Sequence, residues 1–398
     1  MDLQRLRSLV GTELTFTHFA WLTVAASLAL SLIGVYAIDV ATSPDLNDAA
    51  ILSFSGLVKK QLAFLMVGVM AAVAVAIPHY RFVRYFAWPV MWLVLCLLVF
   101  LLIPAVPTSI VKPVNGARAW INLGPISFQP AEVAKIAFII VLADYLRWRS
   151  NHRTLKGLIP PAIIAFIPVG LILLQPDLGT ATLFIPTLFV MLLAAGAKLK
   201  HLSAVVVIAC LAGPAAFPIL KPHQQKRILG LISMIQGSDA GADDINYQSI
   251  TARTVAGAGQ VVGQTDAKAR AIVHFSYLPE RHNDMVFAVI VSRFGFLGGV
   301  VVLGLYALWF AGALLTAAIC REPFGRLVAV GCTSLVAAQM FMNVGMNLGV
   351  LPIVGLTLPF VSYGGSSMLS VWIMTGLIVN IATRRSRRMT RKSFEFDE

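Results

Sequence analysis

Long apolar runs occupy most of this chain, and they constrain its fold more than any other feature. A helix that crosses a bilayer needs about 20 mostly apolar residues. Backbone N–H and C=O groups find no water inside a bilayer, so apolar runs of this length form helices. We therefore expect an all-α polytopic membrane protein with ten transmembrane helices, at 17–38, 61–78, 87–106, 130–146, 158–174, 180–197, 202–220, 285–316, 327–349 and 365–383.

Composition and charge agree with this architecture. The chain is 58% hydrophobic and 12% charged. Ten spans fill most of its length and leave no room for a separate soluble domain, so we expect one integral membrane domain over 1–398. Most Lys and Arg residues fall in alternate short connections and in the basic tail 384–398, which predicts that both termini are cytoplasmic. This topology and anionic lipid account for the net charge of +13 without nucleic acid as a partner.

The same topology makes 221–284, between spans seven and eight, one long extracytoplasmic loop. Loops of this length are usually functional or disordered. Its apolar stretches and low charge density favour short helices that lie on the membrane surface.

A charge cluster stands just before the eighth span. Leu278-Pro-Glu-Arg-His-Asn-Asp284 packs four ionisable side chains into five residues, and a long apolar run follows Asp284. Such a cluster at the lip of a membrane helix is either a boundary marker or an active site.

Glu132 and Lys135 stand in the first turn or so of the fourth span, after Pro130, which suits a helix start. Residues three apart share a helix face, so the two can pair. An ionisable residue inside a membrane predicts a functional site because its insertion is costly. The alternative is a pair that merely neutralises itself near the interface.

Two further motifs fall on the predicted outer side. Asp177 lies in Gln175-Pro-Asp-Leu-Gly179, where turn formation is the plainer explanation. The stretch from Ser362 to Ser367 precedes the last span. Ser366 or Ser367 is expected to cap that helix, although a Gly-rich helix start can also bind an anion.

These signals share one predicted location. Arg118, Glu132, Lys135, Asp177 and Asp284 come from separate segments at or near the outer face. The pattern predicts a composite site that faces outward. A transporter would instead place charges near the midplane, within broken helices.

Five ordered motifs resemble the SEDS family (shape, elongation, division and sporulation) over nearly the whole chain. Within that family the chain is most similar to the RodA members, which Arg281 after Glu280 resembles. The motifs are Leu278-Pro-Glu-Arg-His-Asn-Asp284, Gln175-Pro-Asp-Leu-Gly179, Asn115-Gly-Ala-Arg118, Phe128-Gln-Pro-Ala-Glu-Val-Ala-Lys135 and Leu358-Pro-Phe-Val-Ser-Tyr-Gly-Gly-Ser-Ser367. Two departures stand out. The family usually has two basic residues in succession here, whereas in this chain Arg118 is followed by Ala119. The long loop also lacks the lysine of the family's Gly-Lys-Gly segment.

The resemblance implies a peptidoglycan glycosyltransferase that polymerises lipid II at the outer face of the bacterial cytoplasmic (inner) membrane during cell elongation. It implies a class B penicillin-binding protein (a transpeptidase) as partner, within an assembly that includes MreC and MreD. The alternatives are an FtsW-like division paralogue with the same chemistry, a lipid II flippase and a non-catalytic scaffold.

Within this reading Asp284 is the expected general base, because a carboxylate near the acceptor hydroxyl can remove its proton. The expected substrate-binding residues are Arg118, Lys135, Glu132, Asp177, Lys112 and Ser362. The cations among them suit a pyrophosphate. Asp177 or Glu132 would suit Mg²⁺ or Mn²⁺, because hard cations prefer oxygen ligands.

Overall fold

The computed structural model describes residues 18–43, 55–113, 116–124, 126–149, 151–217, 225 and 247–384. Nearly all of the basic tail and residues 226–246 of the predicted long loop lie outside the described residues.

A helix occupies each of the ten predicted ranges. The helices are α2 (His18–Thr42), α3 (Gly56–Ala76), α5 (Ala87–Leu102), α6 (Pro130–Leu146), α7 (Ile159–Leu174), α8 (Leu178–Ala194), α9 (Leu199–Ala216), α13 (Val286–Ile319), α14 (Pro323–Asn347) and α15 (Gly365–Thr383). Among the described residues, six helices are long and apolar enough to cross a membrane, and three shorter helices are also apolar. The chain is therefore a multi-pass membrane protein, while the number of ten crossings stays a prediction.

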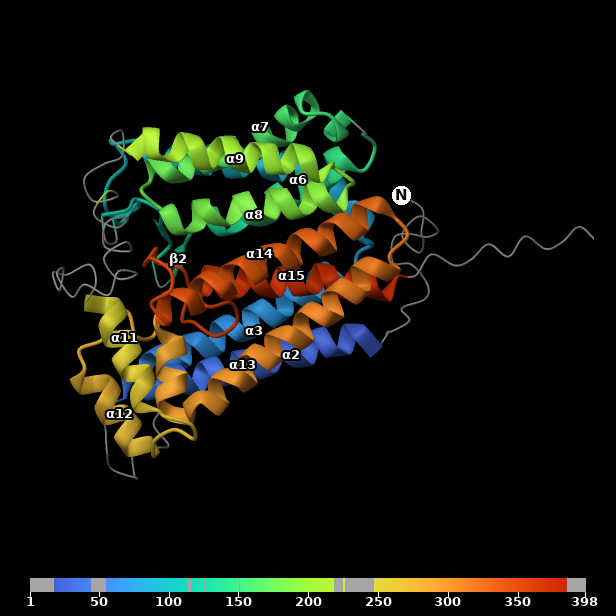
Figure 1. Cartoon of the computed structure of the whole chain (residues 1–398). Coiled ribbons are helices and arrows are strands. Elements are labelled where there is room, and N and C mark those ends of the chain that lie inside the picture. Colours follow the sequence, from blue (N-terminus) through green and yellow to red (C-terminus); the bar gives the residue numbers. More distant parts are fainter. Residues whose placement is uncertain are drawn as a thin grey trace, which may run out of the picture.

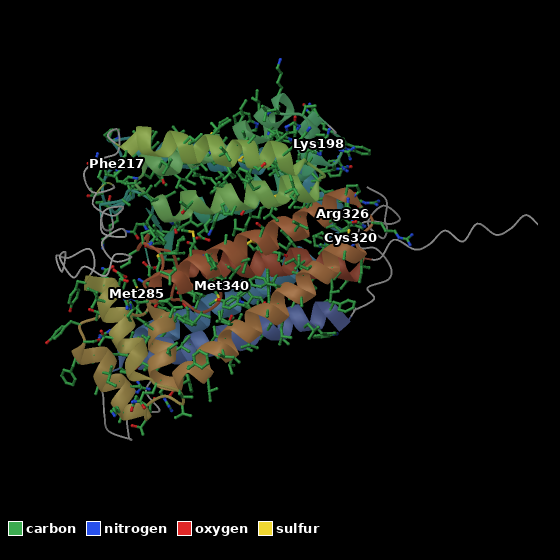
Figure 2. All side chains as sticks on the ribbon, viewed as in Figure 1. Lys198, Phe217, Met285, Cys320, Arg326 and Met340 are labelled. Carbon is green, nitrogen blue, oxygen red and sulfur yellow. The ribbon has the colours of Figure 1, made fainter. Side chains whose placement is uncertain are left out.

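Successive long helices run side by side in alternating directions, so their ends gather at two ends of the bundle (Figure 1). Figure 2 shows Met285 at one end, and Lys198, Cys320 and Arg326 at the opposite end. We call the end with Met285 the site end. The helices α3, α6, α8, α13 and α15 begin there. Which end faces the cytoplasm stays a prediction from the basic residues.

Helix packing encloses the polar residues of α6. Helix α13 packs along α2, α15 packs along α3, and α14 contacts α8, α13 and α6. Of the 17 residues of α6, 14 are buried, including Glu132 and Lys135. The two charges that the sequence places in the membrane are thus surrounded by protein rather than lipid.

Short elements complete the site end. A small hairpin of β1 (Ile121–Asn122) and β2 (Ser127–Phe128) leads directly into α6. Helices α11 (Tyr247–Ala258) and α12 (Asp266–Phe275) occupy the described part of the predicted long loop and pack on α13 and α2. The remaining short helices are α4 (Tyr80–Tyr85), η2 (Asn151–Arg153) and η3 (Lys156–Leu158).

Helix α13 is broken at Gly295, whose φ of 69° no ordinary helix contains. The break frees two backbone N–H groups. Phe296 donates its N–H to the carbonyl of Gln260 at 2.8 Å, and Leu297 donates to Val261 at 3.1 Å. The turn between α11 and α12 thus satisfies backbone groups that would otherwise be left unpaired in a membrane helix.

Candidate functional site

Asp284 ends a tight turn that leads into α13. The turn closes on Glu280, whose carbonyl accepts the N–H of Asn283 at 2.9 Å and of Met285 at 3.3 Å. Glu280 has a positive φ of 49°, an unusual conformation for a residue with a side chain. The Asp284 side chain is partly exposed, and within the described part of the chain its carboxylate has no hydrogen-bond donor. It is therefore free to accept a proton from a substrate.

The surroundings of this carboxylate oppose its ionisation. Burial raises the pKa of Asp284 to about 7, and the negative charges of Glu280 and Asp177 add to the rise. A carboxylate with a pKa near neutrality is a far better proton acceptor at pH 7 than an ordinary aspartate.

Asp177 begins α8 as its N-cap. Its Oδ1 accepts the backbone N–H of Thr180 at 3.0 Å, and its Oδ2 accepts the Thr180 hydroxyl at 2.8 Å. Gln129, immediately before α6, also donates to Oδ2 at 3.0 Å. Asp177 therefore caps a helix, a role that its turn motif did not specify, and it also joins the starts of α6 and α8.

The predicted Glu132–Lys135 pair is confirmed. Lys135 Nζ lies 2.9 Å from Glu132 Oε1, and the lysine side chain is 1% exposed. Ser370 of α15 donates to Glu132 Oε2 at 2.5 Å, and Lys135 also donates to Gln339 of α14 at 3.3 Å. The pair thus joins three helices, and Lys135 influences the site through its charge and its partners rather than through an exposed ammonium group.

The segment before α15 lies between the start of α8, which follows Asp177, and the carboxylate of Asp284. A Cβ atom at Gly179, in the first turn of α8, would lie 2.5 Å from the Val354 carbonyl oxygen and 3.3 Å from that of Gly355. Gly355 has a φ of 72°, and a Cβ atom built on it would lie 3.6 Å from Asp284 Oδ2. Only glycine at 179 permits the first of these approaches, so the starts of α8 and α13 meet across the backbone at 354–355.

The other predicted site residues lie less centrally. Arg118 donates through one guanidinium nitrogen to the carbonyls of Ile103 and Val106, at 3.2 and 3.1 Å, and its Nε is buried without a partner in the described region. Lys112 is exposed. Neither residue forms a hydrogen bond or ion pair with the Glu132–Lys135 pair, Asp177 or Asp284 among the described contacts.

Ser362 is buried and fully engaged. Its hydroxyl donates to the Asn283 carbonyl at 2.6 Å and accepts the Leu358 N–H at 2.7 Å. These bonds attach the Asp284 turn to the segment before α15. The structure therefore gives Ser362 a role in holding that turn, and no free hydroxyl for a substrate.

The expected capping of α15 by a serine is wrong. Its N-cap is Gly364, with no side-chain cap bond. Ser366 instead accepts the Gln129 N–H at 3.1 Å, and Ser367 bonds to Thr357 at 3.0 Å. Both serines tie the start of α15 to neighbouring segments, which a single sequence does not reveal.

The side chains around Asp177 and Glu132 do not form an evident binding site for a divalent cation. The described residues contain no group of three His, Cys, Asp or Glu side chains that would hold one. Glu132 already accepts from Lys135 and Ser370, and Asp177 from Thr180 and Gln129. The predicted cation remains without structural support from these contacts.

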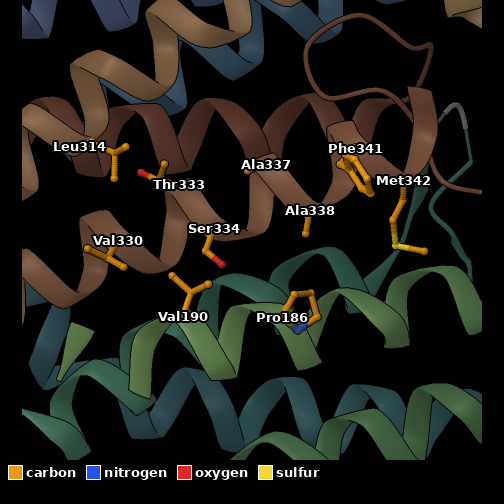
Figure 3. Close-up of a pocket in the computed structure, with 10 residues that line it drawn as sticks. All are labelled: Pro186, Val190, Leu314, Val330, Thr333, Ser334, Ala337, Ala338, Phe341 and Met342. Carbon is orange, nitrogen blue, oxygen red and sulfur yellow. The ribbon is translucent and has the colours of Figure 1, made fainter. Parts of the chain in front are cut away.

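Helix α14 also lines an apolar groove, together with residues of α8 and α13 (Figure 3). It has a volume of about 490 Å³ and is lined by Pro186, Val190, Leu314, Val330, Thr333, Ser334, Ala337, Ala338, Phe341 and Met342. Its lining suits a hydrocarbon chain rather than a sugar or a phosphate. Met342 is adjacent in sequence to Asn343, which contacts the Asp284 turn.

Three buried amides that the sequence interpretation missed also contact the site. Gln339, Asn343 and Asn347 are at most 1% exposed and recur every four residues along α14. Their spacing inside a predicted apolar span could have revealed them in the sequence. Residues four apart share one face of a helix, and polar side chains on such a face are costly in a membrane unless they have partners.

The geometry thus defines a multi-pass helical membrane protein with a half-buried carboxylate and an enclosed ion pair at one end of the bundle. A family model described as "Cell cycle protein", for the FtsW, RodA and SpoVE proteins, matches residues 17–387. The chain belongs to this family, the SEDS family, as its motifs predict.

Individual relatives agree with this assignment. The chain is 33% identical to the stage V sporulation protein E of Bacillus subtilis over 328 residues, covering 81% of this chain and 86% of that protein. It is 31% identical to a probable peptidoglycan glycosyltransferase FtsW of Trichlorobacter lovleyi over 370 residues, 91% of each chain.

Solved structures share the fold. A chain from a study of polymerisation and crosslinking by a peptidoglycan synthase complex superimposes with a TM-score of 0.75 at 30% identity, covering 91% of this chain and 97% of that one. The crystal structure of the rod shape determining protein RodA from Thermus thermophilus gives a TM-score of 0.65 at 27% identity, covering 92% and 97%.

Proposed function

We propose that the protein is a peptidoglycan glycosyltransferase that polymerises lipid II, with Asp284 as the general base. The observation that carries this proposal is the Asp284 carboxylate itself. It is partly exposed, has no hydrogen-bond donor in the described region and lies beside Gly355, and its pKa is raised to about 7 by burial and by the charges of Glu280 and Asp177. The names of the FtsW relatives support the reaction class.

In the proposed reaction the C4 hydroxyl of the acceptor sugar attacks the anomeric carbon of the donor. The new C–O glycosidic bond forms as the bond to the pyrophosphate oxygen breaks, and undecaprenyl pyrophosphate leaves with the bonding electron pair. Asp284 takes the hydroxyl proton. In-line attack inverts the anomeric carbon, which gives a β-1,4 linkage.

The starts of four helices favour the leaving group. Helices α6, α8, α13 and α15 all begin at the site end, and the start of each helix carries partial positive charge. The buried Lys135 adds an ammonium group whose charge Glu132 partly offsets at 2.9 Å. Arg118 and the exposed Lys112 would meet the pyrophosphate in a pose in which the donor extends towards the hairpin of β1 and β2. Glu132 positions the Lys135 ammonium group, and Asp177 positions the start of α8.

We place the reaction at the outer face of the bacterial cytoplasmic membrane, because the basic connections favour a cytoplasmic location for the opposite end. A class B penicillin-binding protein is the proposed partner, in line with the peptidoglycan synthase complex that contains a structural neighbour. Arg281 favours a RodA-like role in elongation, with MreC and MreD in the assembly, over an FtsW-like role in division.

The decisive test is reconstitution of the purified protein and its transpeptidase partner in vesicles with labelled lipid II. We expect glycan polymer in vesicles that contain this chain and no other polymerase, and none in vesicles that contain the transpeptidase partner alone. Translocation of lipid II without polymer would support a flippase instead. If the vesicles show neither polymer nor translocated lipid II, only the scaffold role would remain.

The pH dependence gives an independent prediction. Asp284 must be ionised to act as a base, and its pKa is raised to about 7. The polymerisation rate should therefore rise as the pH increases from 5.5 to 8, with half the maximal rate near the pKa of Asp284. Initial rates at saturating lipid II across this range would check it, and a rate that is flat between pH 5.5 and 8 would contradict the assignment.

A further inference from the structure

We propose, on the basis of the proposed function, that Asn343 and Asn347 are positioning residues that fix the Asp284 turn against α14. Together with Gln339 they form a row of buried amides on one face of that helix, which we call the amide row. The amide row contacts both the Asp284 turn and the Glu132–Lys135 ion pair.

The outer part of the row holds the backbone of Asp284. Asn343 and Asn347 each donate an amide N–H to the Asp284 carbonyl oxygen, at 2.8 and 2.9 Å. Asn343 also donates to the Leu356 carbonyl at 2.6 Å, which connects the turn to the segment beside Gly355. Both side chains are completely buried, so water does not compete for these bonds.

Asn347 also caps α13 from a neighbouring helix. The residue before α13, Met285, makes no side-chain cap bond. Asn347 Oδ1 instead accepts the N–H of Ala288, in the first turn of α13, at 3.1 Å. Because the first N–H groups of a helix have no partner within it, this bond replaces the missing cap and binds the start of α13 to the end of α14.

The inner part of the row holds the ion pair. Gln339 Oε1 accepts from Lys135 Nζ at 3.3 Å, and its Nε2 donates to the Thr357 carbonyl at 2.9 Å. Gln339 and Asn347 are eight residues apart, which is about 12 Å along a helix. A rigid helix thus sets the separation between the Lys135 charge and the Asp284 backbone.

The test compares Asn343→Leu and Asn347→Leu with the wild type in the complete enzyme and partner. Leucine is close in size to asparagine and removes the donor. Thr316→Val is the matched control, because Thr316 is buried on α13 and its hydroxyl bonds the Gly312 carbonyl of its own helix at 2.8 Å. Melting temperature and initial rate are measured on the same preparations.

For each asparagine variant we expect kcat per folded protein to fall at least about tenfold, because small displacements of a reacting group are costly. The KM for lipid II should change less than about threefold. The acidic limb of the pH profile should move about half a unit lower, because a loosened turn lets Asp284 reach water, away from Glu280 and Asp177. Thr316→Val should keep the wild-type kcat and pH profile.

Loss of activity only in proportion to lost folded protein, with the pH limb unmoved, would overturn the proposal. If Asn343→Leu does not fold, Asn347→Leu carries the test, since it keeps Asn343 as one donor to Asp284. A wild-type protein that makes no polymer would refute the proposed function. Polymer from the wild type and a normal kcat in both asparagine variants would refute only the positioning role.

Discussion

Replacement of Asp284 by alanine or asparagine is expected to lower lipid II polymerisation by about 10²- to 10⁴-fold, the usual contribution of a general base. Asparagine keeps the size of the side chain but cannot accept the proton. The measurement is polymer formed per folded protein, with the transpeptidase partner present. The KM for lipid II should change little, since the carboxylate acts on the proton rather than on the pyrophosphate.

Stability separates this loss from unfolding. The pKa of Asp284 is raised to about 7, so the folded protein favours the protonated carboxyl. Stability is therefore lost as the pH rises from the ordinary aspartate pKa of about 4 to about 7, and the loss is complete above that range. Asp284→Asn should therefore melt at a higher temperature than the wild type at pH 8, with a smaller difference at pH 5. Asp144→Asn, which removes a carboxylate paired with Arg147 at the opposite end of α6, is the control and should remain active. Wild-type polymerisation by Asp284→Asn would remove Asp284 as the base.

Replacement of Lys135 by methionine is expected to destabilise the protein by about 3–5 kcal/mol, because Glu132 would remain as a buried charge without its partner. Glu132 is 5% exposed and would keep only the Ser370 hydroxyl as a donor among the contacts described above. A lower melting temperature in detergent and the loss of polymerisation would be the observed results.

The double variant Glu132→Gln with Lys135→Met distinguishes a structural pair from a functional one. It removes both charges, so the melting temperature should return to within a few degrees of the wild type. Polymerisation should stay at least about tenfold below the wild type if the Lys135 charge stabilises the departing pyrophosphate. Recovery of both stability and activity would show that the pair serves the fold alone.

Parts of the site were predictable because they depend on local chemistry. The Glu132–Lys135 pair follows from its spacing of three on a helix, and the structure contains it at 2.9 Å. A turn around Asp177 follows from its motif, and the structure adds that this residue caps α8. In contrast, Ser362 appears in a promising motif, yet its hydroxyl binds Asn283 and Leu358. Partners that are distant in sequence decide whether a polar side chain is free.

The sequence alone determined that this chain is a helical membrane protein of the SEDS family, because apolar run length and ordered motifs are properties of the chain itself. It also singled out Asp284 as the candidate base. Only the tertiary structure brought that carboxylate beside Gly355 and placed Asn343 and Asn347 on the Asp284 backbone carbonyl. The physical reason is that burial, charge proximity and hydrogen-bond satisfaction arise between helices, and periodicity along one helix does not specify which face of a neighbour it will meet.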